Sequence, residues 1–227
     1  MPIVVAFISQ KGGVGKSTLA RALAAVAAHG GLRVLLADLD PRQRTLLQWH
    51  QTRKENKLSP RVTVGAFENV DDALNAGERS DLVILDTPGG VDVSTLAIAR
   101  RAHLVVQPTG PSVDDLRPTV LLFHELAQAN ISKLRLVAAL CRVLLDDEEI
   151  AARSYLEEAG FEVLAGSIPE SARYRIAQNK GQSLTESADR QLNDRADALM
   201  ESLLTKIGSL PEFGSQQVIA EKKGDVA

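Results

Sequence analysis

Short apolar segments alternate along this chain with longer segments that favour helix. The clearest strand-like runs are partly β-branched and are bounded by glycine, proline or acidic residues, and they cover residues 3–8, 33–37, 82–85, 103–108 and 134–140. The segments that favour helix cover residues 16–28, 43–54, 94–101, 113–129 and 148–159. Residues 62–64 and 70–76 add a short strand and a short helix. Strands that alternate with helices predict an α/β fold with a doubly wound, mostly parallel sheet flanked by helices.

The pattern changes near the carboxyl terminus. The sheet pattern fades after residues 166–169, and an apolar stripe at helical spacing then runs from Leu192 to Ile207. From Gly208 onward, glycine, proline, serine and charged residues dominate. We therefore expect a single domain over residues 1–207 and a disordered tail over residues 208–227.

Composition narrows the class of protein. The 227 residues are 44% hydrophobic and 24% charged, which is typical of a globular domain. No apolar run approaches the ~20 residues that a membrane-spanning helix requires. Met1 and Pro2 lead straight into the first strand, so we expect no secretory signal. The single cysteine, Cys141, excludes an internal disulfide framework, fits a reducing cytoplasm and is expected to be buried.

A glycine-rich turn follows the first strand. Residues 10–18 read Gln-Lys-Gly-Gly-Val-Gly-Lys-Ser-Thr, and a helix follows directly. Glycines let backbone amides approach phosphate oxygens closely, and the helix start adds unpaired amides and a positive dipole end. A lysine at the end of such a turn neutralises phosphate, and the following hydroxyl ligates Mg²⁺. The stretch therefore predicts a phosphate-binding loop in which Lys16 meets the β- and γ-phosphates and Ser17 holds the metal.

Acidic residues end two of the predicted strands. Asp38 and Asp40 follow the second strand, and Asp86 ends the strand at residues 82–85. Open parallel sheets place ligands at the carboxyl ends of their strands, so we expect these acids beside the phosphate loop. Asp86 has the position of a Walker B aspartate, which helps to hold Mg²⁺, commonly through water.

Lys11 lies inside the loop and is not needed by an ordinary phosphate loop. Together with the residues up to Thr18 it resembles the deviant Walker A box of the ParA/MinD family of ATPases, within the P-loop NTPases. In that family the early lysine reaches across a dimer to the nucleotide of the other subunit. The resemblance implies ATP and Mg²⁺ as cofactors, with catalytic roles for Lys11 and Lys16. The predicted ATP-binding residues are Lys11, Gly12, Gly13, Val14, Gly15, Lys16, Ser17, Thr18 and Pro169.

Two further blocks resemble the same family. Residues 38–41 look like its switch I box, which implies that Asp40 lies near the attacking water and is needed for hydrolysis. The family usually continues with glutamine after the proline, whereas Arg42 stands here. Residues 168–175 and 181–183 resemble the late block near the adenine, where the family often has a basic residue at the position of Glu170. The sequence starts at the first strand, so the short ParA type, which has no operator-binding domain, is expected.

The resemblance implies a cycle and its partners. ATP builds a homodimer that binds DNA without sequence preference, and a ParB-like or cargo-adaptor protein stimulates hydrolysis. Such proteins are cytoplasmic and nucleoid-associated, and they partition plasmids or chromosomes or position other cargo. The net charge of −3 and isoelectric point of about 5.9 mean that DNA would need a local basic patch. The candidate DNA contacts are Arg173, Arg175, Lys180, Arg190 and Arg195, which can equally be solvated surface charges.

Three other classes of protein fit the sequence less well. A MinD-like membrane ATPase needs a carboxyl-terminal amphipathic helix, and the residues beyond Ile207 show no sustained apolar face, so no stable membrane association is expected. Iron–sulfur relatives on the same fold use paired cysteines, and this chain has one. A small-molecule kinase would leave Lys11 and the acids at 38–40 unexplained.

Overall fold

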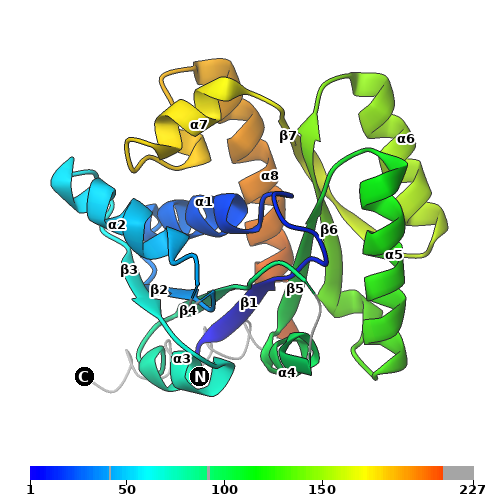
Figure 1. The fold of residues 1–227 in the computed structure, drawn as a ribbon, viewed down its shortest axis with the longest axis horizontal. Coiled ribbons are helices and arrows are strands. Elements are labelled where there is room, and N and C mark those ends of the chain that lie inside the picture. Colours follow the sequence, from blue (N-terminus) through cyan, green and yellow to red (C-terminus); the bar gives the residue numbers. More distant parts are fainter. Residues whose placement is uncertain (41, 91–92, 212–227) are drawn as a thin grey trace, which may run out of the picture.

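A computed structural model describes residues 1–40, 42–90 and 93–211 of the chain. It contains one sheet of seven parallel strands in the order β3-β2-β4-β1-β5-β6-β7 (Figure 1). The strands are β1 (Ile3–Phe7), β2 (Val34–Asp38), β3 (Thr63–Ala66), β4 (Leu82–Asp86), β5 (Leu104–Thr109), β6 (Leu136–Val143) and β7 (Glu162–Pro169). The four strands β1, β2, β4 and β5 are buried at every residue, which is why they read as continuous apolar runs.

Helices cover both faces of this sheet (Figure 1). The helices are α1 (Lys16–His29), α2 (Thr45–Glu55), α3 (Val70–Ala76), α4 (Val93–Arg101), α5 (Val113–Gln128), α6 (Asp146–Glu158), α7 (Ala172–Gln178) and α8 (Arg190–Gly208). Side chains of α1, α2, α7 and α8 share one apolar core with one face of the sheet. Side chains of α3, α4, α5 and α6 share the core on the other face. The predicted doubly wound α/β architecture is confirmed.

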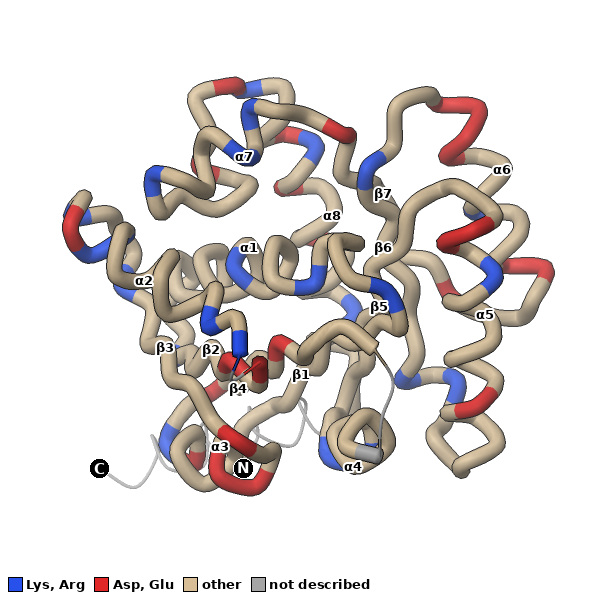
Figure 2. Tube along the Cα trace, viewed as in Figure 1, with Lys and Arg blue, Asp and Glu red and all other residues tan. Residues whose placement is uncertain are grey.

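The register of the strands brings the predicted acids together. Asp38 at the end of β2 lies opposite Asp86 at the end of β4, and Asp86 lies opposite Phe7 at the end of β1. The glycine-rich loop leaves the sheet directly after β1. The loop and both acids therefore meet at the carboxyl ends of the adjacent strands β2, β4 and β1. Figure 2 shows the acidic segments gathered near the ends of β2 and β4.

Two elements were not assigned from the sequence. The edge strand β7 has mixed burial, a glycine at a φ of 80° (Gly166) and irregular pairing with β6, so its pattern is not that of a buried strand. Helix α7 has only seven residues, too few for a periodic signal. Helix α8 matches the predicted apolar stripe and ends at Gly208, and Leu210 packs into the core beyond it. Of the expected disordered tail, residues 212–227 lie outside the described residues. Among the described helices, none is long and apolar enough to cross a membrane.

Candidate nucleotide site

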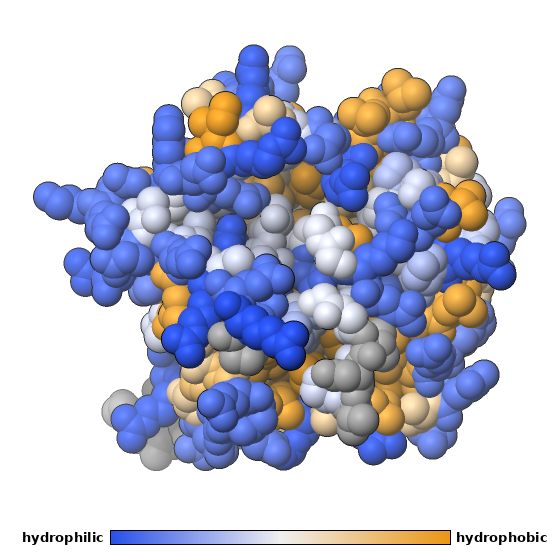
Figure 3. Space-filling model, in the orientation of Figure 1, coloured by the Kyte–Doolittle hydropathy of each residue, from blue (hydrophilic) through white to orange (hydrophobic). Residues whose placement is uncertain are grey.

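The loop between β1 and α1 has the backbone conformation that its glycines predict. Gly13 has a φ of 75° and Gly15 a φ of 111°, values that residues with a side chain rarely adopt. A Cβ on Gly15 would also lie 3.4 Å from the Cys141 Sγ. Gly15 caps α1 without a side-chain hydrogen bond, so the first amides of the helix stay available for an anion. In Figure 3 this region is the pale centre of the visible face.

A cavity of about 280 Å³ lies against this loop. It is lined by residues of the loop, the start of α1, the turn after β2 and the end of β4: Gly12, Gly13, Gly15, Lys16, Ser17, Thr18, Arg21, Asp40, Gln43, Thr45, Asp86, Thr87 and Gly89. The structure therefore brings the predicted residues Lys16, Ser17, Asp40 and Asp86 around one space. We refer to it as the phosphate cavity.

A hydrogen bond within the loop orients the side chain of Lys16. Its side chain is buried, and Nζ donates a hydrogen bond of 3.0 Å to the backbone oxygen of Lys11. Burial lowers the pKa of Lys16, and the nearby carboxylates of Asp86 and Asp40 partly oppose this shift. A preorganised, poorly solvated ammonium interacts more strongly with a polyphosphate than an exposed lysine does.

Asp86 has the properties of a carboxylate that serves a metal. It is 2% exposed and accepts a hydrogen bond from the Ser17 hydroxyl, and its Oδ1 has no described hydrogen-bond partner. Burial raises its pKa to about 7, and Ser17 lowers it only in part. A buried oxygen without a donor beside a serine hydroxyl fits a hydrated Mg²⁺, for which hard oxygen ligands are preferred. Ser17 and Asp86 would hold that ion, which would supply charge neutralisation at phosphate.

The two acids after β2 have different surroundings. Asp38 is 1% exposed and accepts hydrogen bonds from the backbone amides of Asp40, at 3.0 Å, and of Leu46, at 3.1 Å. It therefore fixes the turn between β2 and α2. Asp40 is partly exposed and lines the phosphate cavity, and its Oδ1 accepts from the amides of Arg42 and Gln43. The predicted catalytic role needs a carboxylate that lines the phosphate cavity, as Asp40 does.

A second cavity, of about 340 Å³, continues from the other side of the loop. It includes the predicted residue Pro169 and has apolar walls formed by Val14, Cys141, Ile168, Tyr174 and Leu184. Its rim carries Glu170, which forms ion pairs with Arg142, at 3.3 Å, and with Arg175, at 2.8 Å. A slot that combines these apolar walls with polar side chains, beside a phosphate cavity, suits a flat base, so we refer to it as the base cavity.

Lys11 lines neither cavity with its side chain. Its Nζ lies 3.1 Å from Oδ1 of Asp115, near the start of α5. The ammonium is thus directed to a neighbouring helix of its own chain. Asp115 was not singled out from the sequence, because no local pattern relates two residues 104 positions apart.

Arg21 and Gln178 were also missed. Arg21, in α1, donates to the backbone oxygen of Thr45 at 3.0 Å and to Oε1 of Gln178 at 3.3 Å. Gln178 also donates to the Thr18 hydroxyl at 3.3 Å. These bonds join the start of α2 to the two cavities. The available sequence signal was a charged residue in a helix that is otherwise apolar almost all round.

The candidate DNA contacts divide into two groups. Arg173 pairs with Asp189, Arg175 with Glu170 and Arg195 with Glu149, so carboxylates of the same chain neutralise these three. Among the described residues, Lys180 and Arg190 form no ion pair. The structure does not gather the five into one free basic patch.

Known proteins resemble this chain in sequence and in fold. The carboxysome distribution protein A of Gloeobacter kilaueensis is 29% identical over 184 residues, covering 81% of this chain and 84% of that protein. MinD from Pyrococcus horikoshii with Mg-ADP has a TM-score of 0.71 and 16% identity, covering 89% of this chain and 96% of that one. A putative plasmid partition protein from Borrelia burgdorferi bound to AMPPNP has a TM-score of 0.68 and 19% identity, covering 91% and 100%. These structures show the shared fold.

The family model gives the wider assignment. The model for the CobQ/CobB/MinD/ParA nucleotide-binding domain matches residues 5–184, which include the glycine-rich loop, both acidic turns and the walls of the base cavity. The match covers well over half of the chain and agrees with the geometry around the loop. This chain belongs to the CobQ/CobB/MinD/ParA family of nucleotide-binding domains.

Proposed function

We propose that this protein is a ParA-like, Mg²⁺-dependent ATPase that forms a dimer with ATP, binds DNA without sequence preference and positions a cargo on the nucleoid. The observation that carries the proposal is the direction of Lys11. Its ammonium faces α5, outside the cavities that its own chain offers to a nucleotide. A lysine that lies beside the nucleotide site of its own chain but does not line it is suited to contact the nucleotide of a second subunit.

The residues of the two cavities have different roles in binding and hydrolysing the nucleotide. The base cavity orients the nucleotide, and the loop amides with Lys16 hold its phosphates. Asp40 positions or deprotonates the attacking water, a contribution that is typically worth ~10²–10⁴-fold in rate. Asp40 also accepts hydrogen bonds from two backbone amides, which hold its carboxylate in the turn after β2. We expect slow hydrolysis by the protein alone, with acceleration by a partner protein.

Relatives support the cellular role. The similar proteins include one named for carboxysome distribution and one named as a putative plasmid partition protein. Both names concern the placement of a large object within a cell. The sequence left a MinD-like membrane-associated ATPase as the alternative, and MinD structures share the fold of this chain.

The test is a binding experiment with purified protein. With ATP and Mg²⁺ the protein should retard a random-sequence DNA duplex, and with ADP it should not. Binding should weaken steeply as salt rises, because released counterions drive association with phosphates. Equal retardation with ADP and ATP, or none with either, would contradict the proposal. Sedimentation of the ATP form with anionic vesicles, in place of DNA binding, would favour the membrane alternative.

A further inference from the structure

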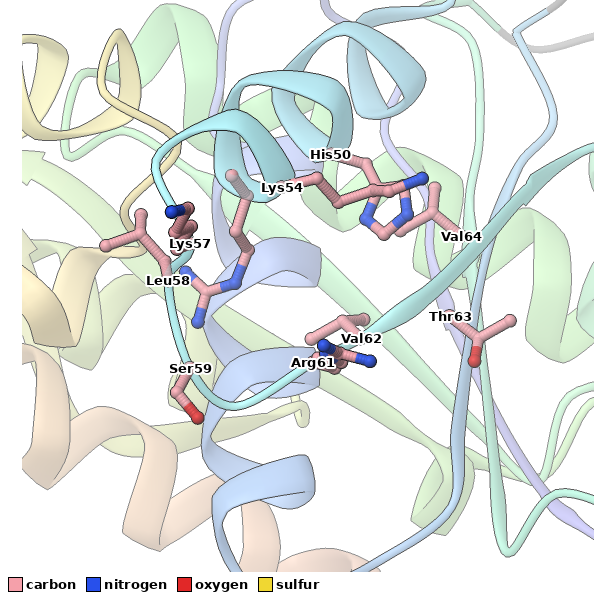
Figure 4. A pocket seen from close by; sticks show the side chains of 10 residues that line it. His50, Lys54, Lys57, Leu58, Ser59, Arg61, Val62, Thr63 and Val64 are labelled. Carbon is pink, nitrogen blue, oxygen red and sulfur yellow. The ribbon is translucent and has the colours of Figure 1, made fainter.

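A cavity of about 760 Å³ lies between α2 and the start of β3 and takes no part in the nucleotide site (Figure 4). Its lining comes from α2, the connection after it and β3: His50, Arg53, Lys54, Lys57, Leu58, Ser59, Arg61, Val62, Thr63 and Val64. Its volume is in the range of known ligand pockets. We refer to it as the edge cavity.

The edge cavity is remote from the phosphate cavity. The turn that carries Asp40 lies at the carboxyl ends of the strands, and α2 then runs back so that β3 can start parallel to β2. The end of α2 and the start of β3 are therefore at the opposite, amino edge of the sheet. A dimer built on the nucleotide sites would leave this cavity accessible.

A free strand edge adjoins the cavity. β3 is the last strand of the sheet and, within the described residues, pairs with β2 alone. Its other edge presents backbone amides and carbonyls with which no described strand pairs. Such an edge is a template for the addition of an extended segment from another chain.

Three cations surround the cavity without compensation. Lys54, Lys57 and Arg61 are exposed, and none of them forms an ion pair with a described residue. Arg53 is already paired with Glu186 through two contacts of 2.7 Å. The described residues that line the cavity include no carboxylate. In a chain with a net charge of −3, this is a local concentration of positive charge that attracts an anionic partner.

Apolar surface makes up most of the lining of the cavity. Val62 is 4% exposed, and Val64 and Leu58 are half-buried. Figure 4 shows His50 beside Val64 on one side, with Arg61 next to Val62. His50 Nδ1 is buried and has no described hydrogen-bond partner. The cavity therefore combines an apolar floor, one unused hydrogen-bonding atom and a cationic rim.

We propose that the edge cavity docks an extended acidic segment of a partner protein, which adds as a strand along the free edge of β3. An apolar side chain of the segment occupies the space over Val62 and Val64. Its carboxylates meet Lys54, Lys57 and Arg61. The backbone of the segment thus pairs with the strand edge, its apolar side chain packs on the apolar floor, and its carboxylates contact the cationic rim.

The shape of the site favours a peptide over a DNA duplex. The phosphates of a duplex contact exposed cations, but they leave an apolar cavity unfilled and make no use of a strand edge. A single extended chain is narrow enough to place one side chain in the cavity while its backbone pairs with β3. The charge alone does not separate the two partners, so DNA is included in the test.

The probe is a fluorescent seven-residue peptide of alternating glutamate and valine. It should bind the wild-type protein without nucleotide, and the affinity should fall as salt rises. Replacement of Lys54, Lys57 and Arg61 by glutamine should weaken binding by about tenfold or more, since charge-assisted contacts are lost. The matched control replaces Arg79, Arg100 and Arg117, three exposed arginines outside the cavity, by glutamine, and it should change the affinity by less than about twofold.

Two further measurements define the mode of binding. Amide exchange of residues 63–66 should slow when the peptide binds, and a peptide with proline at alternate positions should bind weakly, because proline donates no backbone hydrogen bond. Absence of peptide binding, equal binding by the two triple variants, or unchanged exchange in β3 would overturn the proposal. So would a DNA duplex that binds through these three cations while the peptide does not. No ATP is present, so the result is independent of the proposed ATPase cycle.

Discussion

Lys11 and Asp115 form an ion pair between the glycine-rich loop and α5, with 3.1 Å between Nζ and Oδ1. The side chain of Lys11 is 39% exposed and that of Asp115 is 15% exposed, so the pair lies at the surface beside the nucleotide site. Oδ2 of Asp115 accepts from the Ser112 hydroxyl at 3.1 Å, which holds the carboxylate in place. If Lys11 reaches a second subunit when ATP is bound, this pair must first separate.

Asp115→Asn should therefore favour the ATP-dependent dimer. Asparagine can still accept from Ser112, but it no longer holds Lys11 by charge. Exposed ion pairs are worth ~0–1 kcal/mol each, and a dimer contains two, so its dissociation constant should fall, by up to about thirtyfold. Sedimentation equilibrium with ATP measures this, and Asp114→Asn, an exposed neighbour, is the control. A weaker dimer in Asp115→Asn than in the control would show that the pair does not restrain Lys11.

Substitution of Asp40 should impair hydrolysis, whereas substitution of Asp38 should lower stability. Asp40→Ala should bind ATP with near wild-type affinity and lose ~10²–10⁴-fold in turnover, because its carboxylate faces the cavity. Asp38→Ala should unfold at lower urea, since the buried Leu46 amide loses its acceptor at a typical cost of ~1–3 kcal/mol and the half-buried Asp40 amide also loses its acceptor. Single-turnover hydrolysis and urea denaturation on both variants check this. Wild-type turnover in Asp40→Ala would remove its catalytic role.

The buried Arg53 should be essential for stability. Its guanidinium is 2% exposed and joins α2 to Glu186 and to the backbone oxygens of Pro60 and Gly181. Arg53→Met should lower the free energy of unfolding by about 3 kcal/mol, because it leaves the partner carboxylate uncompensated. The double variant with Glu186→Gln should recover part of this loss in a urea denaturation cycle. Full additivity of the two changes would contradict the coupling.

The contribution of the Arg53–Glu186 pair to the free energy of unfolding should decrease as the pH falls. Burial alone would raise the pKa of Glu186, but hydrogen bonds from Arg53 and from the Ser183 amide outweigh it and hold the pKa below its usual 4.5. A carboxyl whose folded-state pKa is depressed contributes stability above its unfolded pKa and loses it as pH falls. The difference between wild type and Glu186→Gln should therefore shrink below about pH 4.5. A difference that grew on acidification would refute this.

Cys141 should be almost inert while the protein is folded. It is 4% exposed, and burial raises the pKa of its thiol to about 12. At pH 8 the thiolate population is then about a thousandfold below that of an ordinary cysteine, and labelling should slow by at least that factor. The rate of reaction with a thiol-reactive dye, measured with and without urea, tests this. Rapid labelling of the native protein would mean that the base cavity opens.

The sequence predicts those parts of the fold and site whose residues are close together in the chain. The strand, glycine turn and helix around Lys16 are contiguous, so both the elements and their chemistry could be assigned. β7 and α7 could not be predicted from the sequence, because an edge strand with irregular pairing and a seven-residue helix show no clear hydrophobic periodicity. Pairs such as Lys11 with Asp115, or Arg53 with Glu186, join residues more than a hundred positions apart. Only the folded chain brings them together.

The edge cavity shows the same limit. Lys54, Lys57 and Arg61 look like solvated charges in the sequence, and nothing local distinguishes them from Arg173 or Arg195. Their lack of carboxylate partners among the described residues is visible only in three dimensions, as is the pairing of Arg173 with Asp189. Charge in a sequence therefore says less about binding than charge that the fold leaves uncompensated.

The most direct test of the account is the oligomeric state of Lys11→Ala. Sedimentation velocity with Mg²⁺ and ATP should show the wild-type protein shifting from monomer to dimer by mass action, and with ADP it should stay a monomer. Lys11→Ala should keep the wild-type fold and thermal stability but remain monomeric with ATP and fail to retard DNA. A Lys11→Ala protein that dimerises with ATP and binds DNA as the wild type does would contradict the central role given to this lysine.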